Sequence, residues 1–188
     1  MNLKFTQDEK KFLGKLVIAT GFAWPVGFIV TIVLSYGVVK QFYPKDTNLI
    51  AGFCLGAFVA YSQWFIIKRY FKISAWWIFA AAIGMGLPFV IEFILFELRG
   101  NESSLTGIDL IDPAVFLFVC GLITGLLQYN SLKSLTSKFR WWIIISALAW
   151  GSGWFGLILG GVIFGFISGI TFLRLFKLPV NVDLDKGK

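Results

Sequence analysis

The chain has 188 residues, of which 57% are hydrophobic and only 14% are charged, and its formal net charge is +7. Soluble domains carry about 25% charged residues, so this composition argues against a soluble protein. Because the sequence has no histidine, a His-ligated zinc or haem site is excluded, and no residue pattern indicates a metal or a cofactor.

Apolar runs of membrane-spanning length recur along the chain. Since a transmembrane helix needs roughly 20 predominantly apolar residues, these runs predict an all-α membrane protein with six transmembrane helices in a single domain. The first run is too long for a signal peptide, and no cleavage site follows it. In chain order, the expected spans cover residues 16–39, 48–69, 75–97, 113–132, 140–159 and 161–176.

A repeat links the middle four spans, because Gln63 recurs as Gln128, 65 residues later. The other pairs in register are Gly56 and Gly121, Lys68 and Lys133, Trp76-Trp77 and Trp141-Trp142, Ala82 and Ala147, and Gly86 and Gly151. Each unit reads as a helix, a short basic turn and a returning helix, which is an antiparallel helical hairpin. The repeat units are therefore 48–112 and 113–160.

The two ends of the chain extend this pattern. Residues 165–177 resemble 121–133, and residues 19–25 resemble 82–88. The sixth span (161–176) and the first (16–39) are thus expected to form a third, split hairpin. Three hairpins would close into a pseudo-threefold six-helix bundle, and glycines at four-residue spacing would let its helices pack closely.

The turn between the last two spans has two candidate positions. The stretch Trp150–Trp154 resembles a turn, but the repeat places Gly151 in the middle of a span, and a turn there would leave the fifth span only about 11 residues. We therefore expect the turn at Gly160-Gly161.

The distribution of positive charge predicts the orientation. If both termini are cytoplasmic, all of the 17 lysines and arginines except Lys40, Lys45 and Arg99 lie on the cytoplasmic side. The net charge is then explained by topology and by attraction to anionic lipids, so no nucleic-acid partner is expected. The membrane is expected to be a bacterial inner or thylakoid membrane.

Gln63 and Gln128 lie about one turn inside the cytoplasmic helix ends, and two interpretations stay open. They either form interhelical hydrogen bonds, or they face a cavity or a lipid headgroup. The residues of this candidate polar or lipid-head site are Gln63, Gln128, Lys68, Lys133, Trp76 and Trp141. The tryptophans are expected to anchor the interface; the alternative is that one of each adjacent pair packs inward against Gln63 or Gln128.

Glu92 is the candidate ion or proton site, because acidic residues within a span are costly and mark functional positions. The repeat gives it no acidic counterpart, and it is expected to be either protonated or close to the outer interface. Catalysis has little support, since the serines lack a partnered base and no paired intramembrane carboxylates occur. We expect no enzyme.

The motif formed by Gln63-Trp64, Trp76-Trp77 and Gly86, with its second copy, resembles repeats in a loose group of uncharacterised bacterial, especially cyanobacterial, polytopic proteins. The second copy departs from it at Tyr129, which takes the place of Trp64. The resemblance implies a repeat-built membrane bundle and no particular activity.

The sequence leaves two main hypotheses for the function. The first is a non-enzymatic scaffold, assembly factor or accessory subunit, whose partners are membrane lipids and another membrane protein. The second is a small transporter or channel with a polar path near Gln63, Gln128 and Glu92.

Overall fold

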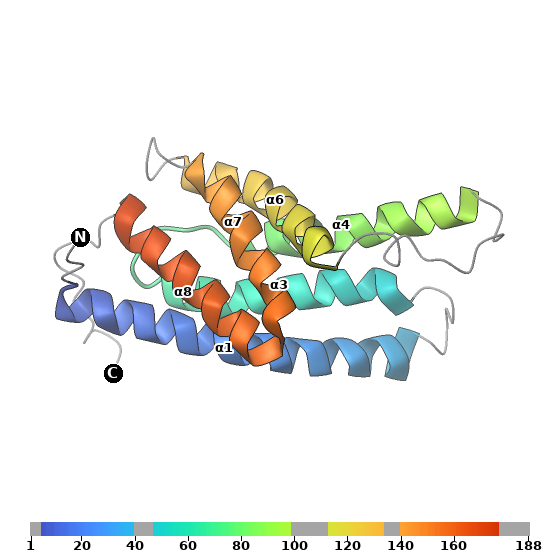
Figure 1. Cartoon of the computed structure of the whole chain (residues 1–188), viewed down its shortest axis with the longest axis horizontal. Coiled ribbons are helices and arrows are strands. Elements are labelled where there is room, and N and C mark those ends of the chain that lie inside the picture. The colour runs from blue at the N-terminus through green and yellow to red at the C-terminus, as the bar shows by residue number, and fades with distance from the viewer. Residues whose placement is uncertain (1–4, 40–46, 99–112, 134–139, 177–188) are drawn as a thin grey trace.

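The computed structural model describes residues 5–39, 47–98, 113–133 and 140–176, which form six α-helices and two short helical turns (Figure 1). The α-helices are α1 (Gln7–Leu34), α3 (Thr47–Ile67), α4 (Trp76–Leu98), α6 (Pro113–Leu132), α7 (Trp141–Gly151) and α8 (Leu157–Phe176). The turns are the π-helical η1 (Ser35–Val39) and the 3-10 helix η2 (Ser152–Phe155).

Among the described residues, four helices are long and apolar enough to cross a membrane. Their spanning segments are Gln7–Gly37, Ile50–Ile67, Ala114–Leu132 and Ile158–Leu175. Large apolar side chains point outward from them, such as Phe22 and Ile158, which are 69% and 67% exposed. An apolar exterior is what lipid requires, so the structure supports the prediction of an all-α chain that integrates into a membrane.

Local sequence signals explain where several helices begin. Helix α1 begins at Gln7 because Thr6 and Glu9 form a capping box, in which the Glu9 N–H donates to the Thr6 hydroxyl at 3.3 Å and the Thr6 N–H donates to the Glu9 carboxylate at 2.8 Å. The helix thus starts nine residues before the predicted span at residue 16. Pro113 is the first residue of α6, where its missing N–H costs nothing.

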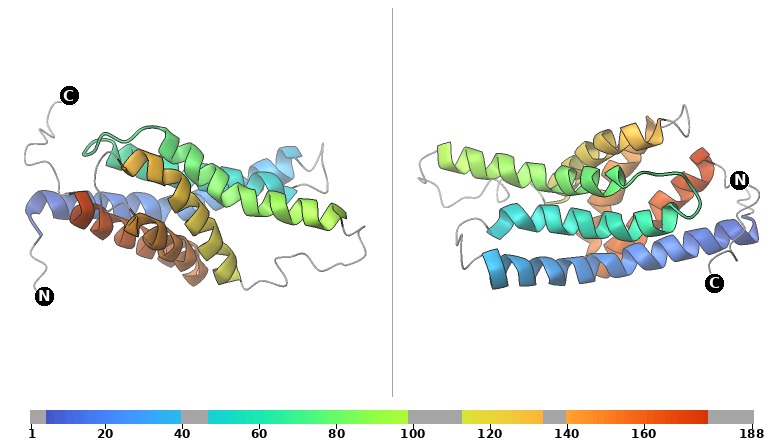
Figure 2. Two further views of the ribbon diagram at one scale, coloured as in Figure 1. Left: turned by 90° about the horizontal axis from the view of Figure 1, so that it is seen from above. Right: turned by 180° about the vertical axis from the view of Figure 1, so that it is seen from behind.

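The six helices contact one another in a closed ring. The most extensive contacts join α3 to α4, α6 to α7, and α8 to α1, which are three antiparallel pairs. Contacts of α1 with α3, of α4 with α6, and of α7 and η2 with α8 link one pair to the next. Viewed from behind, α3 lies between α1 and α4 (Figure 2). The start of α1, the end of α8 and the turn between α3 and α4 lie at the same end of the bundle.

A glycine lies at the close approach in each of these three pairs. A Cβ on Gly121 would lie 2.7 Å from the Ala147 Cα of α7, and a Cβ on Gly165 would lie 2.8 Å from the Val17 Cα of α1. A Cβ on Gly56 would likewise overlap the Ala81 carbonyl of α4. In lipid, helices associate through such backbone contacts, because lipid tails supply no hydrophobic driving force.

The turn between the last two helices is not where we predicted it. Helix α7 ends at Gly151, η2 follows it, the chain reverses at Gly156, and α8 starts at Leu157. The expected turn at Gly160-Gly161 is therefore wrong, because the fifth helix ends before the predicted residue 159 and the sixth starts four residues before the predicted residue 161. The reversal needs Gly156, whose φ of 100° favours glycine. The Ser152 hydroxyl supports it, since it lies 2.6 Å from the Ala149 carbonyl and 3.2 Å from the Gly160 carbonyl.

Replacing Gly121 with alanine should destabilise the bundle, because the new methyl group would overlap the backbone of α7. Overpacking of this kind costs typically about 1–3 kcal/mol in the free energy of unfolding. The measurement is thermal unfolding of the purified protein in detergent. Gly14→Ala is the matched control, since a Cβ at this position would have no atom within 4 Å, and its midpoint should stay the same or rise. Equal losses in both variants would contradict the packing role of Gly121.

Candidate functional site

Helices α3, α6 and α8 each turn a stripe of buried side chains, spaced four residues apart, toward the core. The stripe of α3 is Val59, Gln63 and Ile67; that of α6 is Cys120, Thr124, Gln128 and Leu132; that of α8 is Phe164, Ser168 and Phe172. A spacing of four residues keeps side chains on one helix face. The predicted pair Gln63 and Gln128 thus belongs to the buried core.

At the level of the two glutamines, the core is filled by aromatic side chains. Trp77 of α4, Trp142 of α7 and Phe172 of α8 contact one another, with ring centroids 5.1–5.7 Å apart. We name Gln63, Gln128, Trp77, Trp142 and Phe172 the Trp–Gln layer. Each of its side chains is at most 3% exposed, so the layer closes the centre of the bundle.

Gln128 is locked into this layer by two hydrogen bonds. Its Oε1 accepts from the Trp142 indole N–H at 2.9 Å, and its Nε2 donates to the Trp77 carbonyl at 3.4 Å. It thereby joins α6 to both α7 and α4. For Gln128, the structure supports the interpretation as interhelical hydrogen bonding.

Gln63 is also buried, but its amide nitrogen is not satisfied as that of Gln128 is. Its Nε2 has no partner among the described atoms, and neither has the indole nitrogen of Trp77. The packing of Gly56 on Ala81 and of Gly52 on Met85 places residue 63 opposite the start of α4, where Trp77 lies. In the first hairpin, Gln63 and Trp77 are thus both buried but each keeps an unsatisfied donor, which folded proteins rarely do.

Two further aromatic groups close the core on either side of the layer. Toward the start of α1, Phe71 contacts both Phe172 and Phe12, at 5.6 and 5.9 Å between centroids. Toward the other end, Trp24, Trp150 and Phe164 contact one another at 5.0–6.4 Å. In the described part of the bundle, packed aromatic rings thus separate the buried polar side chains of the core at three levels along its axis.

The six residues of the predicted polar or lipid-head site do not form one cluster. Lys68 and Lys133 are exposed at the helix ends, whereas both glutamines are buried. Trp76 and Trp141 are 41% and 61% exposed, and it is the second tryptophan of each pair that faces inward. The alternative to pure anchoring, in which one tryptophan of each pair packs inward, is therefore the one observed, and the tryptophan that donates to Gln128 is Trp142. The Trp76 indole instead donates to the Leu127 carbonyl at 3.0 Å.

The candidate ion site cannot be placed with the others. Glu92 belongs to α4, but its side chain lies outside the described residues. Cys54 and Cys120 are free thiols. Among the described residues, no group of three or more Cys, Asp or Glu side chains could hold a metal ion.

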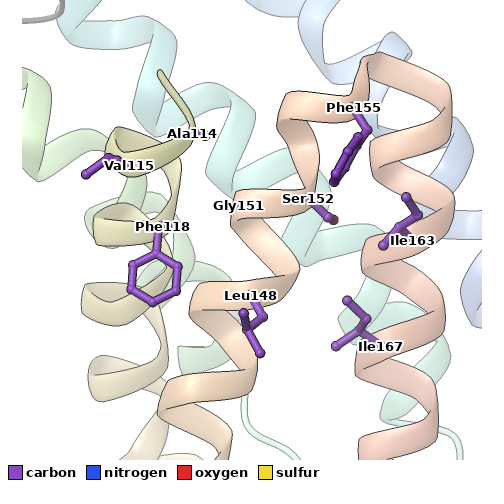
Figure 3. A pocket seen from close by; sticks show the side chains of 9 residues that line it. All are labelled: Ala114, Val115, Phe118, Leu148, Gly151, Ser152, Phe155, Ile163 and Ile167. Atoms are coloured by element: carbon purple, nitrogen blue, oxygen red, sulfur yellow. The ribbon is translucent and has the colours of Figure 1, made fainter. Parts of the chain in front are cut away.

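A groove of about 520 Å³ lies between α6, α7 and α8 (Figure 3). Phe118, Leu148, Phe155, Ile163 and Ile167 line it. Ser152 contributes the one hydroxyl among its described lining residues, and the Ala149 and Gly160 carbonyls lie within hydrogen-bonding distance of it. The lining of the groove is therefore apolar except for the Ser152 hydroxyl.

Two features, one in the core and one at its surface, cannot be found by matching residue types between repeats. Phe172 aligns with the two glutamines and, by residue type, is only a departure from the pattern, yet it fills the same layer. Lys68 is predicted to act with Gln63, but its ammonium lies over the Trp64 ring at 3.8 Å. The four-residue spacing from Trp64 to Lys68 is the signal that predicts the contact between the Lys68 ammonium and the Trp64 ring.

No family model, no curated protein and no solved structure matches the chain.

Replacing Trp142 with phenylalanine should destabilise the protein more than the same change at Trp77. Both changes remove the same atoms from buried rings, but only Trp142→Phe leaves the Gln128 carbonyl without its donor. An acceptor left unsatisfied costs about 1–3 kcal/mol. Thermal unfolding in detergent measures the difference between the two midpoints. If Trp77→Phe is equally destabilised, the hydrogen bond to Gln128 is not what distinguishes the two tryptophans.

Proposed function

We propose that this chain is a non-enzymatic membrane scaffold, assembly factor or accessory subunit that acts by binding another membrane protein. The observation that carries the proposal is the closed core, because the Trp–Gln layer and the two aromatic groups beside it leave the bundle without a polar path among its described residues. A protein whose interior is packed and whose exterior is apolar acts through its surface. A sequence without histidine or a partnered nucleophile supports the non-enzymatic part.

Six spans and a pseudo-threefold arrangement are part of this proposal. Three antiparallel pairs in a ring, each with an aligned glycine at its close approach, support it. The weakest support comes from the fifth span, since α7 with η2 rises roughly 25 Å, against about 30 Å for the 20 residues of α6 or α8.

A small transporter or channel is the second candidate. It is favoured by buried polar atoms that have no described partner, among them Gln63 Nε2, Thr124 Oγ1 and Ser168 Oγ. Such atoms are what a transient path for a polar solute would need. They would have to be connected by movement of the rings that separate them.

The proposal predicts that the tagged chain, solubilised from its native membrane in mild detergent, retains a stoichiometric membrane partner through affinity and size-exclusion steps. Removal of the chain should then lower the amount or the assembly of that partner. Proteoliposomes that contain the chain alone should show no solute or ion flux above protein-free vesicles. A flux that Gln63→Leu abolishes, in a chain that purifies without a partner, would reverse the order of the two candidates.

The proposed topology predicts which residues react with a membrane-impermeant maleimide. Cysteine at Lys10 or Lys133 should react only after the membrane is opened, because both positions are expected to be cytoplasmic in a bacterial inner or thylakoid membrane. Cysteine at Asn101, between α4 and α6 in the sequence, should react in intact cells when the chain is expressed in a bacterial inner membrane. The unmodified chain, with Cys54 and Cys120 inside helices, gives the background. Opposite accessibility of Lys10 and Lys133 would rule out an even number of spans between them.

A further inference from the structure

The end of α3 carries a stack of three rings beneath two cations. Tyr61 lies next to Trp64 and Phe65, at 6.2 and 6.4 Å between ring centroids. The Lys68 ammonium lies 3.8 Å from the Trp64 centroid and 5.1 Å from that of Phe65, and the Arg69 guanidinium lies 4.4 Å from the Phe65 ring. We name these five residues the cationic shelf.

The cationic shelf is held in place before any ligand arrives. The Trp64 indole donates to the Ile73 carbonyl at 3.2 Å, so the ring is tied to the turn that follows α3. Cation–π contacts then restrain the two long basic side chains. Fixing such groups in advance lowers the entropy lost on binding.

The two charges of the shelf are available to an anion. Both Lys68 and Arg69 are exposed, and within the described part of the chain the one ion pair joins Lys11 to Asp8. Below them, Tyr61 and Phe65 are 51% and 39% exposed and lie on a helix that is long and apolar enough to cross a membrane. Aromatic rings with cations just beyond them match the depth of the lipid headgroups.

The shelf is not a requirement of the hairpin, because the second repeat lacks it. Asn130 stands at the position of Phe65, and Ser134 stands at that of Arg69, while Lys133 retains the charge of Lys68. The glycine contacts and the inward tryptophan are present in both hairpins, although only the first hairpin has the cationic shelf. The cationic shelf is therefore not needed for packing of the hairpin, which leaves room for a binding role.

We propose that the cationic shelf is a binding site for the phosphate of an anionic phospholipid in the adjacent leaflet. The Arg69 guanidinium and the Lys68 ammonium share the phosphate, and the three rings contact the glycerol and upper acyl region. Apolar rings at this depth fit a lipid better than a free phosphate ion. The site depends on membrane integration alone and not on the partner proposed above.

The test compares nanodiscs of phosphatidylcholine with nanodiscs that also contain phosphatidylglycerol, using native mass spectrometry for bound lipid and thermal unfolding for stability. The K68Q/R69Q variant should bind phosphatidylglycerol about 5–30-fold more weakly than the unchanged chain, as loss of one or two near-surface cations implies. It should unfold normally in phosphatidylcholine. A second variant, F65N/R69S, carries the residues of the other hairpin and should show the same loss.

The matched control is K15Q/R174Q, which also removes one exposed lysine and one exposed arginine from the same end of the bundle. It should retain most of the phosphatidylglycerol binding. Equal losses in the control and the shelf variants would mean diffuse attraction to anionic lipid and would overturn the proposal. Stabilisation by inorganic phosphate in detergent that requires Lys68 and Arg69 would also overturn it, in favour of a free-phosphate site.

Discussion

Close backbone contact within each antiparallel helix pair is the constraint on which the rest of this structure depends. Lipid tails are as apolar as leucine side chains, so helices in a membrane gain little by hiding apolar surface from their surroundings. Gly56, Gly121 and Gly165 let each pair approach until backbone touches side chain or backbone. Once the pairs are fixed in this way, the adjacent faces of α3, α6 and α8 are committed to the centre, and large rings are needed to fill it.

The centre and the ends of the bundle then take different chemistry. In the middle, Trp77, Trp142 and Phe172 pack together at tilted and edge-on angles, and Gln128 joins three helices through its amide. A buried amide with its bonds made specifies one arrangement of neighbours, because any other leaves it unsatisfied. At the end of α3, by contrast, charge and aromatic rings remain at the surface, where they cost no burial.

The sequence was sufficient to predict the helices but not all their boundaries or faces. Four of the six helices, α3, α4, α6 and α8, begin and end within four residues of their predicted spans, because apolar runs of that length have few alternatives in lipid. The position of the last turn is predicted wrongly because every span is assumed to fill the bilayer. In the structure, Gly156 and Ser152 allow α7 to end early. Two adjacent tryptophans point about 100° apart, and nothing in their identity says which one faces inward. Only the packing of α7 against Gln128 decides in favour of Trp142.

The early end of α7 has a consequence for the lipid around it. In the proposed six-span topology, α7 with η2 is roughly 5 Å shorter than α6 or α8, so it forms a lower protein wall against the lipid. Hydrocarbon chains beside it must shorten or tilt, and such mismatch costs fractions of a kcal/mol for each ångström. The bilayer is therefore expected to be thinner next to α7. Thinning it around two adjacent proteins costs less elastic energy than thinning it around the same two proteins apart.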